Sequence, residues 1–223
     1  MKHMVILSGA GMSAESGIST FRDSDGLWEK YDVTEVASIE GWYKNPDLML
    51  EFYNQRRKQL DSVEPNEGHK IIAGLETNFK VSVITQNVDN LHERAGSTKV
   101  IHLHGELTKV CNESKTQVYE VGTKAIHSGD KADDGSQLRP FIVWFGEAVP
   151  LIEKAAEIVS EADIIIIVGT SMQVYPAAGL IHYAKREIPV YLIDPADVNV
   201  GSNVEVIKEK ASKGLAILKQ KLK

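Results

Sequence analysis

Short apolar runs alternate along this chain with stretches of helical spacing. The runs are rich in β-branched and aliphatic residues and cover Met4–Leu7, Val81–Thr85, Val100–Leu103, Ile164–Val168 and Val190–Ile193. Continuous runs of this length are typical of strands buried on both faces of a parallel sheet. Other stretches place apolar residues three and four positions apart, as helices that cover a sheet do: Asn66–Asn78, Leu151–Ala162, Ala177–Lys185 and Val204–Leu222. The pattern predicts a doubly wound α/β core.

Two segments interrupt this alternation, at about 23–64 and about 106–140. Both leave the predicted core and return to it near strand ends, so we expect two insertions that form a small module. The remaining segments, 1–22, 65–105 and 141–223, then make up the main domain. The second insertion is rich in Ser, Thr, Gly, Asp and Lys, and with few large apolar residues it should have little core of its own.

Composition and charge exclude several classes of partner. Apolar residues make up 43% of the chain and charged residues 25%, as in ordinary globular proteins. The net charge of -6 comes from interspersed acids and bases, so we expect no nucleic-acid partner and no anionic membrane surface. The longest aliphatic run, Ile164–Val168, is far shorter than the ~20 residues that cross a bilayer. We expect a monomer.

The start of the chain and its cysteine content predict the compartment. The first residues run directly into an apolar strand and a glycine turn, without the features of a signal peptide. A single cysteine, Cys111, cannot form an internal disulfide, which favours a reducing environment. We therefore expect a cytoplasmic protein.

Polar clusters follow several predicted strands directly, namely Gly9–Arg22, Gln86–Asp89, His104 and Gly169–Ser171. In open α/β sheets, ligands bind outside the carboxyl ends of the strands. These clusters therefore predict one binding cleft.

The cluster after the first strand begins with Gly9-Ala10-Gly11. Small residues at such a turn let the backbone approach a pyrophosphate closely, ahead of a helix. Phe21 and Arg22 add an aromatic face and a guanidinium that can bind ribose or phosphate. Glycines are equally common at any tight turn, and a loop arginine is often only solvated, so both interpretations remain open.

The clusters after the second and third strands offer amides and an imidazole. Asn87 and Asp89 can bind a carboxamide such as nicotinamide, and Gln86 can reach a ribose hydroxyl; the alternative is a capped turn before a helix. His102 and His104 lie two apart, on one face of a strand. We expect His104, at the strand end beside a glycine, to act as a base near neutral pH. We do not expect this of His102.

Taken together, five blocks resemble the sirtuin family, in which they occur in the same order: Gly9–Arg22, Thr85–His92, His104–Leu107, Pro140–Glu147 and Val168–Ser171. The resemblance covers nearly the whole chain and is weakest between Thr108 and Leu138 and after Asp194. It implies a Rossmann-like NAD-binding domain with a small inserted module, and an acyl-lysine peptide or protein bound in the cleft between them.

The resemblance also implies a reaction. Sirtuins consume NAD to remove acyl groups from lysine, releasing nicotinamide and 2'-O-acyl-ADP-ribose. By motif matching, His104 and Asn87 are the catalytic residues. The cofactor contacts are Gly9, Ala10, Gly11, Ala14, Phe21, Arg22, Gln86, Asp89, Gly169, Thr170 and Ser171. We also expect cofactor contacts at Asp194, Pro195 and Ala211, outside the matched blocks; an acidic residue at a strand end binds ribose hydroxyls in dinucleotide-binding folds. The substrate strip is Val143, Trp144, Phe145, Gly146 and Glu147. A mono-ADP-ribosyltransferase and an NAD-binding sensor without turnover remain alternatives.

One pair of residues predicts the acyl group. Tyr53 and Arg56 lie three apart in a stretch of helical character, Leu48–Arg57, and so project from one face. A phenol beside a guanidinium suits a carboxylate. In sirtuins that prefer acidic acyl groups, a Tyr and an Arg at this spacing are the selectors, and Ala14 matches their roomier pocket. We therefore expect succinyl or malonyl groups, with acetyl secondary; the alternative is an exposed arginine on an amphipathic helix.

The chain departs from the family at its zinc site. Sirtuins usually carry two cysteine pairs that bind a structural zinc ion, whereas here only Cys111 remains. The nearby acids and histidine do not have the spacing of a zinc motif: His127, Asp130, Asp133 and Asp134. We expect NAD and no zinc. In addition, Ser19 replaces a common proline, and Asp194-Pro195 stands where an asparagine often contacts the adenosine.

Overall fold

The main domain is built on a six-stranded parallel sheet. The computed structural model describes residues 1–18, 31–170, 174–198, 201 and 203–222. The strand order is β3-β2-β1-β7-β8-β9, and every pair is parallel. This order is that of a doubly wound, Rossmann-like sheet and confirms the predicted fold class. The strands are β1 (His3–Ser8), β2 (Lys80–Thr85), β3 (Val100–His102), β7 (Ile164–Val168), β8 (Val190–Ile193) and β9 (Val204–Ile207).

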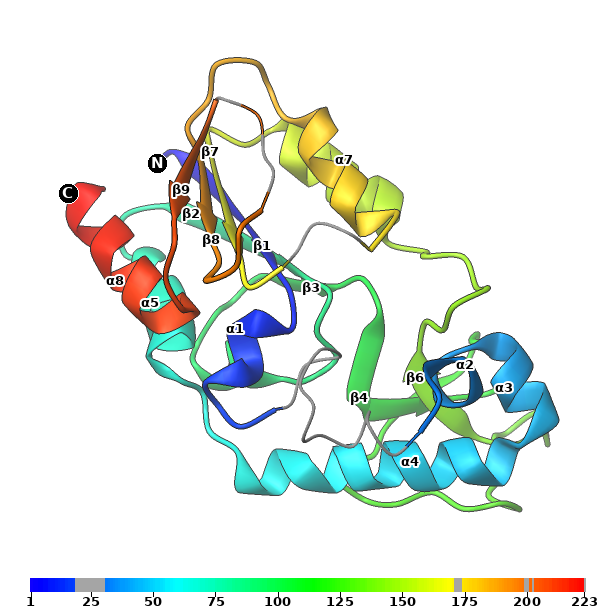
Figure 1. Ribbon diagram of the computed structural model, residues 1–223. Helices are drawn as coiled ribbons and strands as arrows, with labels where there is room; N and C mark the ends of the chain where they lie inside the picture. Colours follow the sequence, from blue (N-terminus) through cyan, green and yellow to red (C-terminus); the bar gives the residue numbers. More distant parts are fainter. Residues whose placement is uncertain (19–30, 171–173, 199–200, 202, 223) are drawn as a thin grey trace.

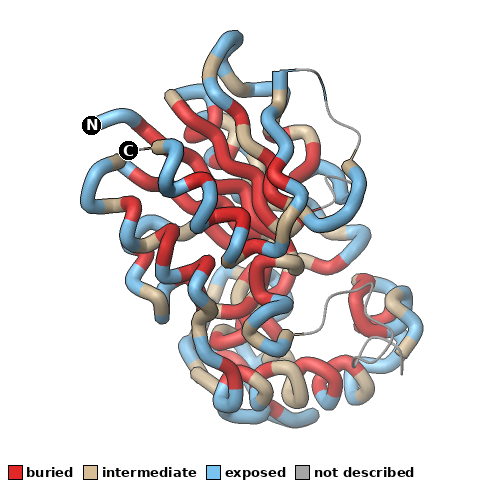
Figure 2. The backbone as a smooth tube through the Cα atoms, turned by 60° about the vertical axis from the view of Figure 1, so that its left-hand side comes forward, coloured by how far each residue is buried: buried red, intermediate tan, exposed pale blue. Residues whose placement is uncertain are grey.

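Helices cover both faces of this sheet (Figure 1). On one face α5 (Glu67–Leu75) and α8 (Ala211–Lys221) pack over β1, β2 and β7. On the other, α7 (Ile152–Ser160) and the 3-10 helix η3 (Ala177–Tyr183) enclose a second core. The central strands are buried along most of their length (Figure 2). None of the helices in the described ranges is long and apolar enough to cross a membrane.

The last two predicted helices differ from the structure. The sequence predicted a helix over Val204–Leu222, but Val204–Ile207 is strand β9 and the helix begins at Ala211. Val204 pairs in register with Val190 of β8, so the backbone of this run pairs with that strand of the sheet instead of forming a helix. The stretch from Ala177 forms a 3-10 helix to Tyr183, and an internal glycine, Gly179, lowers its α-helical propensity.

The small module combines helices from the first insertion with an antiparallel sheet from the second. The helices are α2 (Val33–Val36), α3 (Ile39–Lys44), α4 (Pro46–Gln59) and η2 (Leu60–Ser62). The strands, in the order β5-β4-β6, are β4 (Gly105–Cys111), β5 (Val118–Glu120) and β6 (Arg139–Ile142). Both insertions share one apolar core, to which the second contributes Leu107, Val110 and Ile126. The exact domain limits stay a prediction.

A buried arginine joins the two insertions. Arg57, on α4, is fully buried, and its Nε donates a hydrogen bond to the Leu107 carbonyl at 2.7 Å. Its Nη1 donates to Asn54 Oδ1 at 2.8 Å. Burial lowers the pKa of Arg57 to about 10, so it stays charged at neutral pH. This side chain fixes α4 against β4, and α4 carries the residues predicted to select the acyl group.

Candidate active site

The turn after β1 contacts the end of β7 through backbone atoms alone. Gly9 N donates to the Val168 carbonyl at 3.1 Å, and Gly11 N donates to the Gly169 carbonyl at 2.8 Å. A Cβ on Gly11 would lie 2.8 Å from Gly169 Cα. Gly169 has φ +62°, and a Cβ there would lie 2.2 Å from Met12 N. A side chain at these positions therefore collides with backbone.

This contact lies between β1 and β7, where the strand order reverses. Such a switch point is where doubly wound sheets open a ligand crevice. The fold therefore requires these glycines, while Ala10 and Gly11 stay partly exposed. The short helix α1 (Gly11–Ala14) follows and ends at the exposed Ala14.

A buried polar network lies beside this turn. Asn87 Nδ2 donates to Ser13 Oγ at 2.9 Å, and the Ser13 hydroxyl donates to Asp89 Oδ2 at 2.9 Å. Asp89 Oδ1 accepts from Leu91 N at 3.1 Å, at the start of α6 (Leu91–Arg94). Burial raises the pKa of Asp89, and these hydrogen bonds together with the charge of Arg56 oppose that shift.

Ser13 is the member of this network that the sequence interpretation missed. A serine next to a glycine-rich turn is common in proteins, so its place in the sequence offered no reason to assign a function to it. Its hydroxyl nevertheless orders both Asn87 and Asp89, because it accepts from one and donates to the other. Buried polar groups held in this way can recognise a carboxamide without reorganising.

His104 is held in the form that a base requires. It is partly buried, and its Nδ1 lies 3.1 Å from the Gln86 carbonyl oxygen. A carbonyl only accepts hydrogen bonds, so Nδ1 carries the proton and Nε2 keeps its lone pair. Burial lowers the pKa of His104, although the Gln86 hydrogen bond opposes this. The imidazole is therefore neutral at pH 7. Gln86 itself donates from Nε2 to Thr170 Oγ1 at 3.2 Å.

His102 is held in the opposite state. Its Nδ1 lies 2.8 Å from the Asn87 carbonyl and its Nε2 lies 2.7 Å from Glu93 Oε1. Both partners are acceptors, so both ring nitrogens donate and neither is free to take up a proton. Burial lowers the pKa of His102, but the hydrogen bond and charge of Glu93, the Asn87 carbonyl and the charge of Glu106 together outweigh burial, and the net shift is upward. His102 thus fixes the backbone of Asn87, a role that its sequence position did not suggest.

Tyr53 and Arg56 lie on α4, as the helical spacing predicted. Tyr53 is 2% exposed, and burial raises the pKa of its phenol to about 12, with Arg56 opposing the shift. Arg56 is half-buried, with Cζ 5.8 Å from the Phe52 ring centroid. Burial lowers the pKa of Arg56, while Tyr53 and Asp89 oppose this. Arg56 therefore interacts electrostatically with both the phenol and the Ser13 network.

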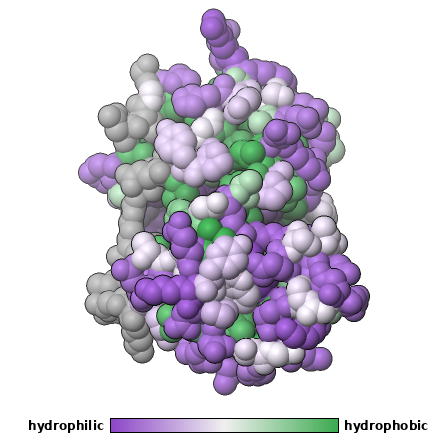
Figure 3. All heavy atoms as spheres, turned by 90° about the vertical axis from the view of Figure 1, so that its right-hand side faces the viewer, coloured by the Kyte–Doolittle hydropathy of each residue, from purple (hydrophilic) through white to green (hydrophobic). Residues whose placement is uncertain are grey.

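The predicted substrate strip follows β6. Val143 N donates to the His104 carbonyl at 2.9 Å, which joins the strip to the candidate base. Phe145 is 55% exposed, but its backbone is paired: its N–H donates to the Ala37 carbonyl, and its carbonyl accepts from Ile39 N. Hydrophobic side chains reach the surface in the middle of the face that Figure 3 shows, among hydrophilic ones. Gly146 is exposed, with φ +90°.

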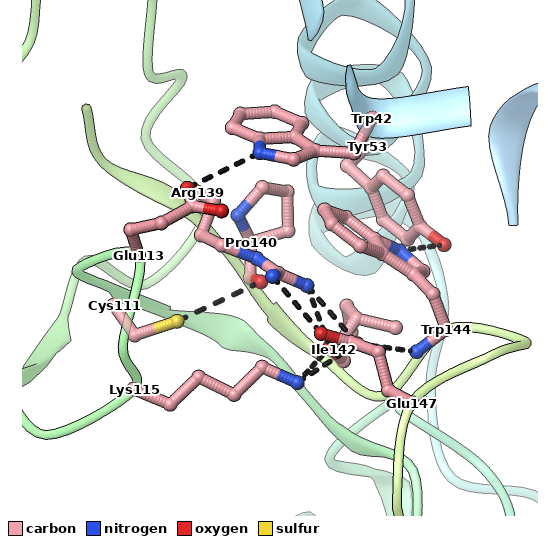
Figure 4. A network of polar contacts seen from close by, with 10 residues as sticks. All are labelled: Trp42, Tyr53, Cys111, Glu113, Lys115, Arg139, Pro140, Ile142, Trp144 and Glu147. Carbon is pink, nitrogen blue, oxygen red and sulfur yellow. Dashed lines mark hydrogen bonds and ion pairs between the residues drawn. The ribbon is translucent and has the colours of Figure 1, made fainter. Parts of the chain in front are cut away.

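Glu147 is engaged within the protein. Its Oε1 accepts from Arg139 Nη1 at 3.0 Å and its Oε2 from Nη2 at 3.1 Å. Oε2 also lies 2.8 Å from Lys115 Nζ and 2.8 Å from the backbone N of Trp144 (Figure 4). We call these four residues, Lys115, Arg139, Trp144 and Glu147, the Arg139–Glu147 clamp. It joins β6, the strip after it and the turn between β4 and β5.

Aromatic side chains enclose the cationic half of this clamp. Arg139 is 1% exposed, and its Cζ lies 3.7 Å from the Trp144 ring centroid and 5.8 Å from that of Trp42. The indole of Trp42 donates to Glu113 Oε2 at 3.2 Å. A guanidinium that stacks on an aromatic ring and pairs with both oxygens of a carboxylate has little freedom to move or rotate.

The residues near Cys111 do not fit a zinc ion. Burial raises the pKa of the Cys111 thiol to about 11, and this is the single cysteine of the chain, whereas a structural zinc site takes four ligands, usually cysteine or histidine. The thiol faces the Pro140 carbonyl at 3.9 Å. Asp130 and Asp134 accept hydrogen bonds from backbone amides of neighbouring turns. Within the described ranges, no three His, Cys, Asp or Glu side chains are grouped to hold a metal.

Of the remaining predicted contacts, some lie outside the described residues and others lie near the end of β8 and the start of α8. Phe21, Arg22 and Ser171, like Ser19, lie outside the described residues. Asp194 follows β8, the strand next to β7, and its carboxylate accepts from Ala196 N at 2.9 Å. Pro195 is exposed, whereas Ala211 is 4% exposed and starts α8 in the core. The residues that meet at the switch point are Gly9, Gly11, Ser13, Gln86, Asn87, Asp89, His104, Gly169 and Thr170.

This assembly fits a dinucleotide. The glycine turn offers backbone that a Cβ would block, the Ser13 network offers buried amide and carboxylate groups, and His104 offers a neutral imidazole. A pyrophosphate requires the accessible backbone of the glycine turn, a carboxamide requires the buried amide and carboxylate groups, and the activation of a hydroxyl requires the neutral imidazole.

Comparisons with known proteins agree with this arrangement. A model of the Sir2 family matches residues 9–176. An NAD-dependent protein deacylase of Bacteroides thetaiotaomicron is 58% identical, with 100% of this chain and 98% of the relative covered. One of Helicobacter pylori is 54% identical, with the same coverage. A crystal structure of a Sir2 homolog–NAD complex has a TM-score of 0.88 at 39% identity, covering 100% of this chain and 91% of the other.

The clamp predicts a large effect on stability. Glu147→Gln leaves Arg139 buried without its counter-charge, so we expect the free energy of unfolding to fall by ~3–5 kcal/mol in urea titrations. Asp197→Asn breaks the exposed Asp197–Lys208 ion pair and should leave stability near wild type. The double variant Arg139→Met/Glu147→Leu should be more stable than Glu147→Gln, because it removes both charges. A Glu147→Gln protein as stable as Asp197→Asn would contradict this role.

Proposed function

Since this chain belongs to the Sir2 family, the sirtuins, we propose that it is an NAD-dependent protein-lysine deacylase that prefers acidic acyl groups, succinyl or malonyl, over acetyl. The deacylase activity rests on one observation above all. His104 is a neutral imidazole with Nε2 available at the switch point, next to the Ser13–Asn87–Asp89 network. The acidic preference rests on Tyr53 and Arg56.

The chain's own groups divide the work of this reaction. Bound NAD supplies the ribose to which the acyl group is transferred. Asn87 and Asp89, ordered by Ser13, hold the carboxamide end, and the Gly9 turn accommodates phosphate. His104 Nε2 takes a proton from a ribose hydroxyl, while the Gln86 carbonyl stabilises the imidazolium that forms. The burial of this network excludes water that would compete for the same bonds.

The acyl end is recognised from α4. Arg56 has its guanidinium in a partly desolvated position, where a carboxylate would be held by charge-assisted hydrogen bonds. The Tyr53 phenol keeps its proton at physiological pH because its pKa is raised to about 12. A protonated phenol beside a guanidinium can donate hydrogen bonds to a carboxylate, whereas the methyl group of an acetyl has no acceptor to receive them.

The pH dependence of catalysis tests His104. Its base form is the deprotonated one, and burial places its pKa below 6.5. We therefore expect kcat/KM to be constant near pH 7–8 and to fall only as the pH drops below 6.5. His104→Gln should lower kcat/KM by ~10²–10⁴ and remove this acid limb. An acid limb centred above pH 6.5, or ADP-ribosylated protein in place of acyl-ADP-ribose in mass spectra, would contradict the assignment.

The acyl preference is tested by Arg56→Met. Removing a charge-assisted partner of a carboxylate costs ~1.5–3 kcal/mol, so the ratio of succinyl-lysine to acetyl-lysine kcat/KM should fall by about one to two orders of magnitude. Lys58→Met is the matched control, because Lys58 lies on the same helix but is exposed. Equal losses on both peptides in Arg56→Met would refute the carboxylate role.

We also propose that the small module folds without zinc, which the clamp and the protonated, buried Cys111 support. Elemental analysis of the purified protein should find zinc well below one ion per chain. Incubation with EDTA should leave the Tm unchanged, while a zinc protein treated in parallel loses its metal. Stoichiometric zinc that a chelator removes together with a drop in Tm would overturn the proposal.

A further inference from the structure

One hydrogen bond connects the Arg139–Glu147 clamp with the residue proposed to read the acyl tip. The indole Nε1 of Trp144 lies 2.9 Å from the Tyr53 hydroxyl (Figure 4). Both side chains are 2% exposed, and their rings lie 6.0 Å apart. Water therefore has little access to this contact, which makes its geometry a fixed property of the site.

The chemistry of the two groups sets the direction of this bond. An indole N–H has no lone pair, so it can only donate. The Tyr53 oxygen must therefore accept, which uses one of its lone pairs and leaves its own O–H proton for another partner. Within the described part of the chain, no other hydrogen bond to this hydroxyl is found. The phenol is thereby prepared as a donor.

The clamp holds the indole in the orientation that this requires. Glu147 Oε2 accepts from the Trp144 backbone N at 2.8 Å, and the Arg139 guanidinium stacks on the indole with Cζ 3.7 Å from its centroid. The backbone and the ring of Trp144 are thus fixed by Glu147 and Arg139, respectively. Trp42, which lies 5.4 Å from Trp144 between ring centroids, packs on the same guanidinium.

We propose that Trp144 is a positioning residue for acyl specificity: its indole N–H orients the Tyr53 hydroxyl so that the phenol donates to the carboxylate of a succinyl or malonyl group. This rests on the proposed acidic-acyl preference. In this arrangement Arg56 provides the positive charge that attracts the carboxylate, and Tyr53 provides a hydrogen-bond donor of fixed orientation. The carboxylate meets a donor that is already oriented, so less rotational freedom is lost on binding.

The test is a double-mutant cycle on acyl preference. Trp144→Phe removes the N–H and keeps an aromatic ring, whereas Tyr53→Phe removes the hydroxyl and keeps the Trp144 packing. Each should lower the succinyl-to-acetyl ratio of kcat/KM by about 3- to 10-fold, as the loss of one hydrogen bond would. Because both act through the same bond, the double variant should be no worse than Tyr53→Phe alone.

Trp42→Phe is the matched control. It changes the other tryptophan on Arg139, whose N–H goes to Glu113 rather than to Tyr53. A general weakening of the clamp would affect Trp42→Phe and Trp144→Phe alike in Tm, whereas only Trp144→Phe should change the acyl ratio. Should Trp144→Phe fail to fold, an unchanged ratio in Tyr53→Phe still refutes the role of Trp144, because its indole N–H acts through that hydroxyl.

The outcomes separate this inference from the function on which it rests. If Arg56→Met lowers the ratio but Tyr53→Phe does not, the acidic preference stands and the positioning role of Trp144 is refuted. An additive loss in the double variant, or an equal change in ratio for Trp42→Phe, also refutes it. If Arg56→Met itself leaves the ratio unchanged, the proposed acyl preference fails first.

Discussion

The ion pair between Arg139 and Glu147 is the interaction on which the geometry of the small module depends. A guanidinium that is 1% exposed is strongly unfavourable without a counter-charge. Here the carboxylate supplies it through two hydrogen bonds and also binds Lys115 and the backbone of Trp144. One side chain therefore joins strand β6, the β4–β5 turn and the strip that continues from His104. Moving any of them leaves a buried charge unpaired, so the network constrains all of them together.

The candidate active site follows a similar rule, with backbone carbonyl groups as the partners of its histidines. Gln86 and Asn87 are consecutive residues after β2, and each presents its carbonyl to a different histidine. His104 gains one acceptor and stays neutral; His102 gains a second acceptor from Glu93 and becomes charged. Two imidazoles two residues apart thus have opposite protonation states because of one additional carboxylate. The charged one orders the loop in which Asn87 lies, and the neutral one is left for chemistry.

The sequence predicted the sheet well, because the runs such as Ile164–Val168 are buried on both faces and leave little ambiguity. The prediction was wrong at Val204–Ile207, because a run of four residues fits the spacing of a helix as well as that of a strand. Pairing with the edge of β8 makes this run a strand. The strand-end clusters do meet: Ser13 bonds to both Asn87 and Asp89, and His104 contacts the Gln86 carbonyl, while their roles in binding and catalysis stay a prediction. Ser13, His102 and Arg139 were missed as members of the networks, because their roles depend on partners far along the chain: Asp89, Glu93 and Glu147. Such pairings are set by the fold and leave no local pattern.

The state of Cys111 has a consequence for the chemistry of the cell. In a module organised around metal-bound thiolates, peroxide and metal starvation act on the same group, because the ligands are also the most oxidisable atoms. Here the one cysteine is fully buried and protonated, and charge pairing with aromatic stacking organises the strands around it. The small module thus offers no nucleophilic sulfur to an oxidant. Mild oxidants that inactivate proteins through reactive thiolates therefore have no such target at Cys111.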